Sequence, residues 1–412
     1  MKKLLIFMMS FVFLLSSAPL KAQAKADPPT VSADSVVLMD AITGYVLYGK
    51  NENSAYPPAS TTKLMTALLT LEKCKLDDVV TVGKNPPIVD GSKIYLFEGE
   101  QLKVRDLLYG LMLQSGNDCA EALAEHVGGS IDNFAVLMNK RALELGCKNS
   151  NFVNPSGLYN EKHKTSAKDL ALIMRELSNK PEYTQIASTS FYEIPPTNKS
   201  AVKRPLWNEN KLIQKSSQLY YDGCQGGKTG YTTQSEHSYV SYATRNGQKL
   251  IVALVHDKNK TFFPDAVNLF NYGFSTFESV LLYKKGDLVT TYNNNGVTVP
   301  LLAASNFYYV KLKEDTSPAP KFVLKDENLS VKFFKTGDTI AEGTVVKNNE
   351  NLGTLKLTSG TSHELKQVLQ SSPFKSMNVK MEYLIPGVLI IIGGAIFMFK
   401  KYKLFNKLFN KE

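Results

Sequence analysis

The chain has 412 residues and carries 48 Lys plus Arg against 38 Asp plus Glu, a formal charge of +10 at pH 7. With 43% hydrophobic, 10% aromatic and 21% charged residues, the composition is that of a folded protein and excludes a disordered chain, a collagen and a disulfide-dense miniprotein. The length suits two or three domains. A charge of +10 raises the question of a nucleic-acid partner, which depends on where the charge lies.

The N-terminus has the pattern of a secretory signal peptide. Lys2 and Lys3 precede an apolar run over residues 4–15, and small residues follow as far as Ala22-Gln23-Ala24, an A-x-A-like cleavage site. A buried N-terminal helix would need neither the lysine pair nor the small residues. We therefore expect residues 1–24 to be a signal peptide.

Residues 383–399 form an uncharged, apolar stretch just long enough to cross a bilayer. The lysines of residues 400–412 follow it directly, as the positive-inside rule requires of a cytoplasmic flank. The pattern predicts a linker over 371–382, a transmembrane helix over 383–399 and a cytoplasmic basic tail over 400–412. The expected location is the cell membrane, with a single-pass C-terminal anchor and the catalytic domain on the extracellular side.

Most of the positive charge lies in these two ends. Lys2, Lys3 and Lys21 account for +3 and residues 400–412 for +4, so residues 25–382 keep only +3. This charge predicts no nucleic-acid partner. The cysteines show no C-x-x-C pair, so we predict no metal site and no cofactor, and their disulfide state stays open: Cys74, Cys119, Cys147 and Cys224.

In chain order, the first predicted element is a hairpin over residues 34–50, because β-branched and aromatic runs flank a Gly-containing turn. A helix is predicted over 60–73, where Leu64, Leu68 and Leu71 recur on one face. Further helical patterns follow, the last with Ser166 as its N-cap: 102–113, 118–126, 132–145 and 167–177.

From residue 190 onward the pattern favours strands. Strands are predicted over 191–194, 237–244 and 249–255, the last two joined by an Asn-Gly turn, and a short helix over 264–271. Short β-like runs separated by turn residues fill 286–370. We predict an α+β catalytic domain over 25–280, with an antiparallel sheet and a helical cluster, followed by a small all-β domain and the transmembrane helix.

Ser60-Thr61-Thr62-Lys63, at the start of a predicted helix, is the first motif whose side chains could carry out catalysis. Residues three apart share a helix face, so the Lys63 amine can approach the Ser60 hydroxyl and take its proton. The helix N-terminus adds N–H donors where an oxyanion would form. Ser-x-x-Lys alone is weak evidence, since it recurs at 200–203 and 372–375.

Two further motifs accompany it in order along the chain. Ser115-Gly116-Asn117 lies at a predicted helix junction. Lys228-Thr229-Gly230 begins a predicted strand after a Gly-rich turn over 223–227, and Gly230 would let a substrate lie close to the strand. Together the three motifs predict a serine acyl-enzyme.

The set resembles the Ser-x-x-Lys acyl-enzymes, the penicillin-binding proteins and class A β-lactamases. The closer resemblance is to the low-molecular-mass D-alanyl-D-alanine carboxypeptidases, the peptidase S11 family. Asn154-Pro155-x-Gly157-Leu158 and Tyr272-Gly273-Phe274 share it. The likeness covers residues 34–280 strongly and the β-rich domain weakly.

The resemblance implies a β-lactamase/transpeptidase-like fold and a penicillin-binding serine-type carboxypeptidase. Its substrate would be the peptidoglycan stem pentapeptide, from which it removes the terminal D-alanine, and β-lactam antibiotics would inhibit it. Ser60 would be the nucleophile, Lys63 the base and Ser115 a proton relay. The substrate-binding residues would be Asn117, Lys228, Thr229, Gly230 and Tyr231, with the backbone N–H groups of Ser60 and Tyr231 as the oxyanion hole.

Two departures from the family pattern stand out. The family commonly has an Arg that helps to bind the substrate carboxylate where this chain has Phe262. Either Lys258 or Lys260 is a candidate replacement, and a different substrate is the alternative. A Ser-Glu pair replaces a small Ala-Gly pair, and we expect Glu236 to face solvent.

Other functions remain open at this point. The chain could be a DD-endopeptidase acting on peptidoglycan crosslinks, or a non-catalytic penicillin- or wall-binding protein. A class A β-lactamase is disfavoured, because no Glu-x-x-x-Asn pattern lies between Asn117 and Lys228. The histidines outside the motifs, at 126, 163, 256 and 363, are predicted to be structural.

Overall fold

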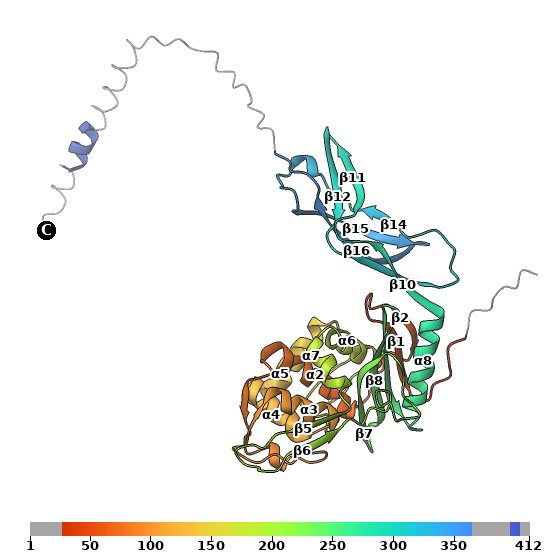
Figure 1. Ribbon diagram of the computed structural model, residues 1–412. Helices are drawn as coiled ribbons and strands as arrows, with labels where there is room; N and C mark the ends of the chain where they lie inside the picture. Colours follow the sequence, from red (N-terminus) through yellow and green to blue (C-terminus); the bar gives the residue numbers. More distant parts are fainter. Residues whose placement is uncertain (1–26, 365–395, 404–412) are drawn as a thin grey trace, which may run out of the picture.

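The domain that precedes the β-rich part of the chain is built on a five-stranded antiparallel sheet in the computed structural model, which describes residues 27–364 and 396–403 (Figure 1). In spatial order its strands are β2 (Val46–Lys50), β1 (Ser35–Asp40), β9 (Gln248–Asp257), β8 (Glu236–Arg245) and β7 (Cys224–Thr232). The predicted hairpins β1–β2 and β8–β9 are confirmed. In the second, Asn246 and Gly247 both have positive φ, as a tight type I′ turn requires.

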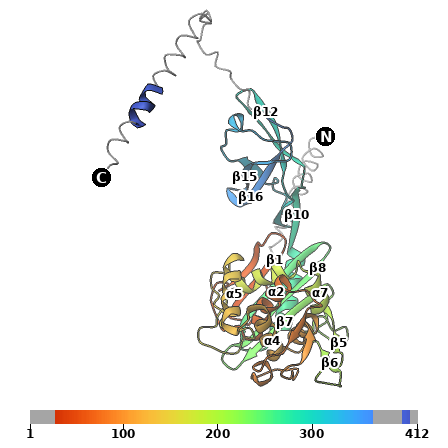
Figure 2. The same ribbon diagram turned by 90° about the vertical axis from the view of Figure 1, so that its left-hand side faces the viewer.

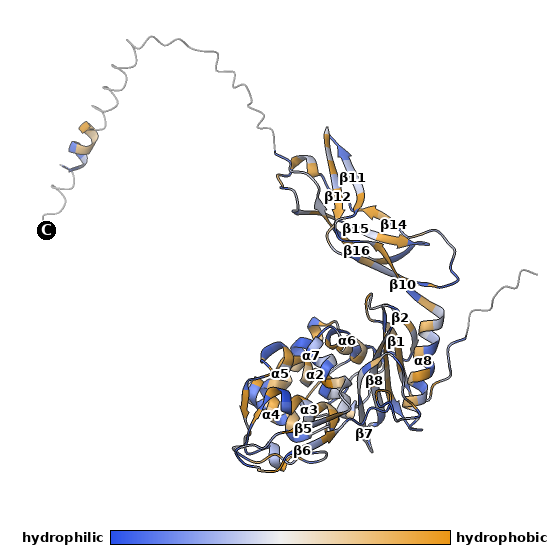
Figure 3. Cartoon of the chain, in the orientation of Figure 1, coloured by the Kyte–Doolittle hydropathy of each residue, from blue (hydrophilic) through white to orange (hydrophobic). Residues whose placement is uncertain are grey.

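Helices cover both faces of this sheet (Figures 1 and 2). Helix α8 (Phe262–Thr276) packs on one face, and Figure 3 shows it with both hydrophobic and hydrophilic stretches. The helical cluster lies on the other face: α2 (Lys63–Lys73), α3 (Val104–Leu113), α4 (Asn117–Gly128), α5 (Ile131–Glu144), α6 (Ala167–Leu177) and α7 (Pro181–Ser188).

Strand β1 lies between the two cores that these helices make with the sheet. Val37 and Met39 pack into the core with the helical cluster, and Val36 and Leu38 into the core with α8. A strand buried on both faces needs an unbroken apolar run, and Val36 to Met39 supplies one.

The predicted helices of the cluster are confirmed to within a few residues. The Ser166 hydroxyl accepts a hydrogen bond from the Asp169 backbone N–H, so the predicted N-cap of α6 is confirmed as well. Helix α7 was not predicted. Helix α8 is longer than the predicted 264–271, because Pro264 lies in its first turn, where the missing N–H costs no hydrogen bond.

The predicted Gly-rich turn over 223–227 is wrong beyond its first residue. Gly223 turns with φ +89°, but β7 begins at Cys224, so Gly226 and Gly227 are strand residues. A Cβ on Gly226 would lie 2.6 Å from the Cβ of Ala187 in α7. Gly226 therefore lets α7 pack closely on the strand.

Two short hairpins flank the helical cluster: β3 (Val79–Thr81) with β4 (Gln101–Lys103), and β5 (Phe191–Ile194) with β6 (Arg204–Trp207). Strand β5 is at the predicted position. Short 3-10 turns lie at η1 (Ala59–Thr62), η2 (Pro86–Ile88) and η3 (Leu329–Val331).

A small all-β domain follows α8, as predicted. Strands β10 (Phe277–Tyr283) and β13 (Phe307–Leu312) pair with each other. A five-stranded sheet has the order β11 (Leu288–Asn294), β12 (Val297–Ala303), β16 (Glu350–Ser359), β15 (Thr339–Lys347) and β14 (Lys321–Leu324). Its separate core includes Leu301, Val345 and Leu357.

The prediction of a transmembrane helix over 383–399 is wrong for the part of the chain that the structure describes. Most of that range lies outside the described residues, and residues 396–403 form a short helix. None of the described helices is both long enough and apolar enough to span a bilayer. The fold class is corrected to an α+β domain with a small all-β domain, and the single-pass cell-membrane location is withdrawn with its anchor. The predicted signal peptide, 1–24, lies outside the described residues.

Candidate active site

Ser60 lies in the 3-10 turn η1, which continues into α2. Side chains three residues apart eclipse in a 3-10 turn, and the Lys63 Nζ atom accordingly lies 2.9 Å from the Ser60 Oγ atom. The preceding residue, Ala59, has φ +50°, an unusual value for a residue with a Cβ. The backbone is thus bent sharply just before the serine.

The Lys63 amine is completely buried and has three polar neighbours. Besides Ser60, it donates to the Asn117 Oδ1 atom and to the Ser156 carbonyl oxygen, each at 2.7 Å. Asn117 Nδ2 donates to the Asp90 carbonyl oxygen, which turns the Asn117 oxygen toward the lysine. Both oxygens can only accept hydrogen bonds. A neutral amine that donates to both therefore directs its lone pair at the Ser60 hydroxyl.

The electrostatic surroundings favour that neutral amine. Burial is the main cause that lowers the pKa of Lys63 well below its usual value, and the positive charge of Lys228 lowers it further. A lysine in this state can accept the proton of a serine hydroxyl, which an ordinary lysine cannot do at neutral pH.

The segment 154–158 holds the Ser156 carbonyl oxygen in place. Asn154 Oδ1 accepts the backbone N–H groups of Ser156 at 3.2 Å and Gly157 at 2.7 Å, and Asn154 Nδ2 donates to the Leu158 carbonyl oxygen. Gly157 has φ +84°, and a Cβ there would lie 1.8 Å from the Ala59 carbonyl oxygen. Only glycine allows this segment to pack against η1.

Strand β7 is an edge strand of the sheet, and it brings Lys228, Thr229 and Gly230 alongside Ser60. A Cβ on Gly230 would lie 2.8 Å from the Ser60 backbone nitrogen, so the two backbones touch. Lys228 is 3% exposed and donates to the Thr229 carbonyl oxygen at 2.9 Å. Burial lowers the pKa of Lys228 to about 8.

Ser115 lies between α3 and α4, at the helix junction that the sequence predicts. Its backbone is left-handed, with φ +58°, and its side chain lines the same cleft as Ser60. The hydrogen bonds that Lys63 makes within the described part of the chain go to Ser60, Asn117 and Ser156 rather than to Ser115.

These residues surround a cleft of about 600 Å³. The sequence-predicted residues Lys63, Asn117 and Lys228 lie behind its wall. The cleft is lined by Ser60, Ser92, Ser115, Glu209, Thr229, Gly230, Tyr231, His237, Lys260 and Phe262. Three of these were not considered as site residues in the sequence: Ser92, Glu209 and His237. Lys260 was one of two candidates for replacing the family arginine, and Phe262 occupies the place of that arginine.

Unusual backbone conformations mark the same region. Apart from five asparagines, which tolerate the left-handed region, the described non-glycine residues with positive φ are Ala59, Tyr95, Ser115, Glu236, His256 and Lys260. Ala59, Ser115, Glu236 and Lys260 line the cleft or adjoin a lining residue. Such conformations are typical of functional sites. The sequence does not reveal these positive φ values, because the positions are not occupied by glycine.

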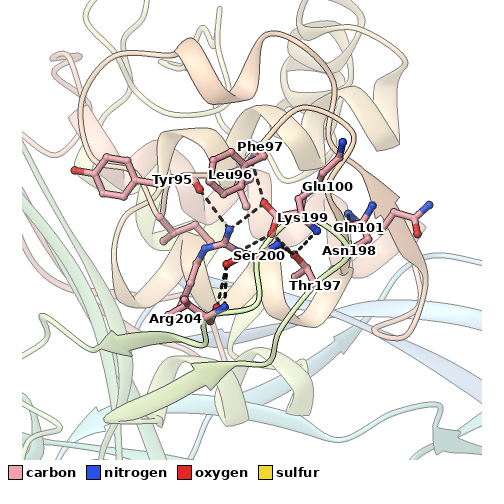
Figure 4. Close-up of polar contacts among 12 residues, drawn as sticks. Tyr95, Leu96, Phe97, Glu100, Gln101, Thr197, Asn198, Lys199, Ser200 and Arg204 are labelled. Carbon is pink, nitrogen blue, oxygen red and sulfur yellow. Dashed lines mark hydrogen bonds and ion pairs between the residues drawn. The ribbon is translucent and has the colours of Figure 1, made fainter.

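A buried ion pair between Arg204 and Glu100 lies outside the set of residues that line the cleft (Figure 4). Arg204 Nη1 and Nη2 lie 2.8 and 3.0 Å from the two carboxylate oxygens of Glu100, which is fully buried. Burial alone would raise the pKa of Glu100, but the hydrogen bonds from Arg204 and Thr197 hold it below the usual value. The pair joins the segment before β4 to the first residue of β6.

Comparison with known proteins assigns the family. Residues 22–259 match the peptidase S11 family, described as D-alanyl-D-alanine carboxypeptidase, and residues 277–365 match the C-terminal domain of penicillin-binding protein 5. The chain belongs to the D-alanyl-D-alanine carboxypeptidase family. It is a serine hydrolase of penicillin-binding-protein-like fold, and the family and serine-type carboxypeptidase function predicted from the sequence are confirmed.

Individual relatives agree with this assignment. The chain is 36% identical over 300 residues to the D-alanyl-D-alanine carboxypeptidase DacF of Bacillus subtilis, covering 70% of this chain and 75% of DacF. It is 35% identical over 284 residues to DacC of Escherichia coli, covering 66% of this chain and 68% of DacC. The crystal structure of penicillin-binding protein 5 from Haemophilus influenzae superposes with a TM-score of 0.69 at 29% identity, covering 82% of this chain and 99% of that one.

Proposed function

We propose that this D-alanyl-D-alanine carboxypeptidase removes the terminal D-alanine from peptidoglycan stem pentapeptides through an acyl-enzyme on Ser60. The observation that carries the proposal is the buried Lys63 amine, 2.9 Å from the Ser60 Oγ atom and hydrogen-bonded to two fixed acceptors. This arrangement supplies a nucleophile and, within hydrogen-bond distance, a base that can take its proton.

In the acylation step, Lys63 takes the proton of the Ser60 hydroxyl as the oxygen attacks the carbonyl carbon between the two D-alanines. The negative charge that develops on the carbonyl oxygen meets the backbone N–H groups of Ser60 and Tyr231. The close contact between Gly230 and the Ser60 backbone supports this pairing, because it brings the two segments side by side. Collapse of the intermediate breaks the C–N bond and leaves the peptide esterified to Ser60.

The leaving D-alanine amine needs a proton, and the proposed route runs from Lys63 through Ser115. Ser115 lines the cleft beside Ser60, which supports the role of relay. Water then attacks the ester with Lys63 again as the base, and Ser60 regains its proton. Atoms balance in the overall reaction: one water is consumed and one D-alanine is released.

The substrate-binding roles fall to Asn117 and to strand β7. Asn117 would hold the peptide amide, Thr229 and Gly230 would line the backbone of the bound peptide, and Lys228 would supply positive charge behind the terminal carboxylate. β-Lactams would acylate Ser60 in the same way. Along the chain we propose a signal peptide over 1–24, a catalytic domain over 25–280, a β-rich domain over 286–370 and a linker over 371–382.

The test is the release of D-alanine from a synthetic stem pentapeptide by the full-length chain. The proposal predicts stoichiometric D-alanine and tetrapeptide, and no release by a Ser60→Ala variant. Failure of the wild-type chain to release D-alanine, with Ser60 still labelled by penicillin, would instead indicate a binding protein. Cleavage confined to crosslinked dimers would indicate an endopeptidase.

A further inference from the structure

Two lysines lie in the loop between β9 and α8, but they face different surroundings. Lys258 lies 3.6 Å from the Asp34 carboxylate, which also pairs with His256 at 2.7 Å. Lys260 lines the cleft that holds Ser60, and within the described part of the chain it forms no ion pair. Of the residues that line this cleft, Lys260 is the one cation whose side chain is exposed to it.

The loop is built to hold Lys260 in this place. The buried Asp257 carboxylate accepts the backbone N–H groups of Asn259 at 3.0 Å and Thr261 at 2.7 Å, on both sides of Lys260. Lys260 itself has φ +57°, a conformation that costs energy for a residue with a long side chain. The fold retains a strained lysine at the edge of the cleft, where a glycine would be relaxed.

The wall next to Lys260 is aromatic. The His237 ring stacks on Tyr231 with a centroid distance of 4.4 Å and lies 5.6 Å from the ring of Phe262. Phe262 is 5% exposed and also packs on Phe263, so it is a core residue with an edge in the cleft. Burial, and then the charge of Lys260, lower the pKa of His237, which leaves Lys260 as the cation of this wall.

A carboxypeptidase must distinguish a free C-terminal carboxylate from a continuing chain, and a cation placed in its cleft can do so. Lys228 is 3% exposed, and its amine is bonded to the Thr229 carbonyl oxygen. We propose that Lys260 binds the terminal carboxylate of the substrate directly and thereby makes the enzyme select peptides that end in a free carboxylate. This inference rests on the proposed function of the same cleft.

The experiment compares two substrates that differ only at the carboxylate. Full-length wild-type chain and variants act on a stem pentapeptide and on the same peptide with a C-terminal carboxamide, with kcat/KM measured for each. In Lys260→Ala we expect kcat/KM for the free acid to fall about 10- to 100-fold, the usual range for losing a hydrogen bond to a charged group, with the carboxamide changed less than about twofold. Lys260→Arg should keep the preference for the acid.

Lys258→Ala is the matched control, since it removes a neighbouring exposed lysine of the same loop. This variant should leave kcat/KM unchanged for both substrates. The inference would be overturned if the ratio of kcat/KM for the acid to kcat/KM for the carboxamide were the same in Lys260→Ala as in the wild type. This includes the case in which both values fall equally.

A second ratio keeps the inference separate from the proposed function. Acylation of Ser60 by a penicillin, which has a free carboxylate, and by its methyl ester, which has none, needs no D-alanine release. In Lys260→Ala the rate of acylation by the acid should come closer to the rate of acylation by the ester, so the difference between the two rates should be smaller than in the wild type. If the wild-type chain releases no D-alanine but this difference narrows, the proposed function fails and the role of Lys260 stands. If D-alanine is released and the difference stays the same, the role of Lys260 fails.

Discussion

The Lys63 Nζ atom and the Asn117 Oδ1 atom lie 2.7 Å apart, and both side chains are buried. Asn117 cannot rotate away, because its Nδ2 atom is bound to the Asp90 carbonyl oxygen at 2.6 Å. Together with the Ser156 carbonyl oxygen, it decides where the lone pair of a neutral Lys63 points. The chemistry proposed for Ser60 depends on this arrangement and on the lowered pKa of the lysine.

Lys228→Met should shift the pH dependence of Ser60 acylation to higher pH. The charge of Lys228 disfavours protonation of Lys63, so its removal raises the pKa of Lys63 and leaves less neutral base at a given pH. The measurement is the rate of penicillin acylation between pH 5 and 10. Lys211→Met, which removes an exposed lysine outside the cleft lining, serves as the control. An acid limb of the variant at or below that of the wild type would contradict the account.

Gly230→Ala should slow acylation of Ser60 by about 100-fold, the cost of a displacement of roughly 1 Å in a catalytic group. The added Cβ would lie 2.8 Å from the Ser60 nitrogen and 2.9 Å from the Pro58 carbonyl oxygen, both backbone atoms. Gly83→Ala is the control, because the new Cβ would meet only the end of the Glu125 side chain. Full acylation by Gly230→Ala would show that the strand need not touch the serine.

His163 should make the stability of the protein fall in mild acid. Its Nδ1 atom accepts the Val153 N–H, so its Nε2 atom donates to the Thr62 hydroxyl at 2.8 Å. Burial, and then the charge of Lys63, lower the pKa of His163 from 6.5 to about 4. The unfolded chain takes up this proton below about pH 6.5 and the folded one only near pH 4. Stability is therefore unaffected above pH 6.5 and decreases by about 3 kcal/mol as the pH falls toward 4.

The measurement for His163 is urea unfolding of the wild type and of His163→Gln between pH 4 and 7.5. Carboxylates titrate in both proteins, so only the difference between the two reports the histidine. That difference should shrink as the pH falls. A difference independent of pH would show that His163 does not titrate in this way.

Arg204→Met should destabilise the protein by about 3–5 kcal/mol, because it leaves the fully buried Glu100 carboxylate without its partner. The double variant with Glu100→Gln should lose less than the sum of the single losses, since the two residues are coupled. Lys203→Met breaks the exposed pair with Glu193 and should cost under about 1 kcal/mol. Additive losses in thermal unfolding would contradict direct coupling.

The sequence predicts elements best where periodicity or turn chemistry is strong, as in the β8–β9 hairpin and the N-cap of α6. It fails at α7, whose eight residues bury only Tyr183, Ile186 and Ala187, too few to form a helical pattern. It also fails at Gly226, where a glycine that serves packing resembles a turn residue.

Within the site, the motif residues could be predicted because each motif is a distinctive combination of residue types in the sequence. The Ser156 and Asp90 carbonyl oxygens could not, since every residue has one. Lys260 was one of two candidates, and only the structure separates them: Lys258 pairs with Asp34, whereas Lys260 lines the cleft. The predicted transmembrane helix rested on the length of an apolar stretch and on the lysines that follow it, and no described helix has the length and apolarity to support it.

The central claim is that a neutral Lys63 activates Ser60, and Lys63→Arg tests it most directly. Arginine keeps a positive charge at all accessible pH values and cannot act as a base. Intact-mass measurement after penicillin treatment should find one adduct on wild-type chains, located by peptide mapping to Ser60, and none on folded Lys63→Arg. An adduct formed on Lys63→Arg at the wild-type rate would contradict the account.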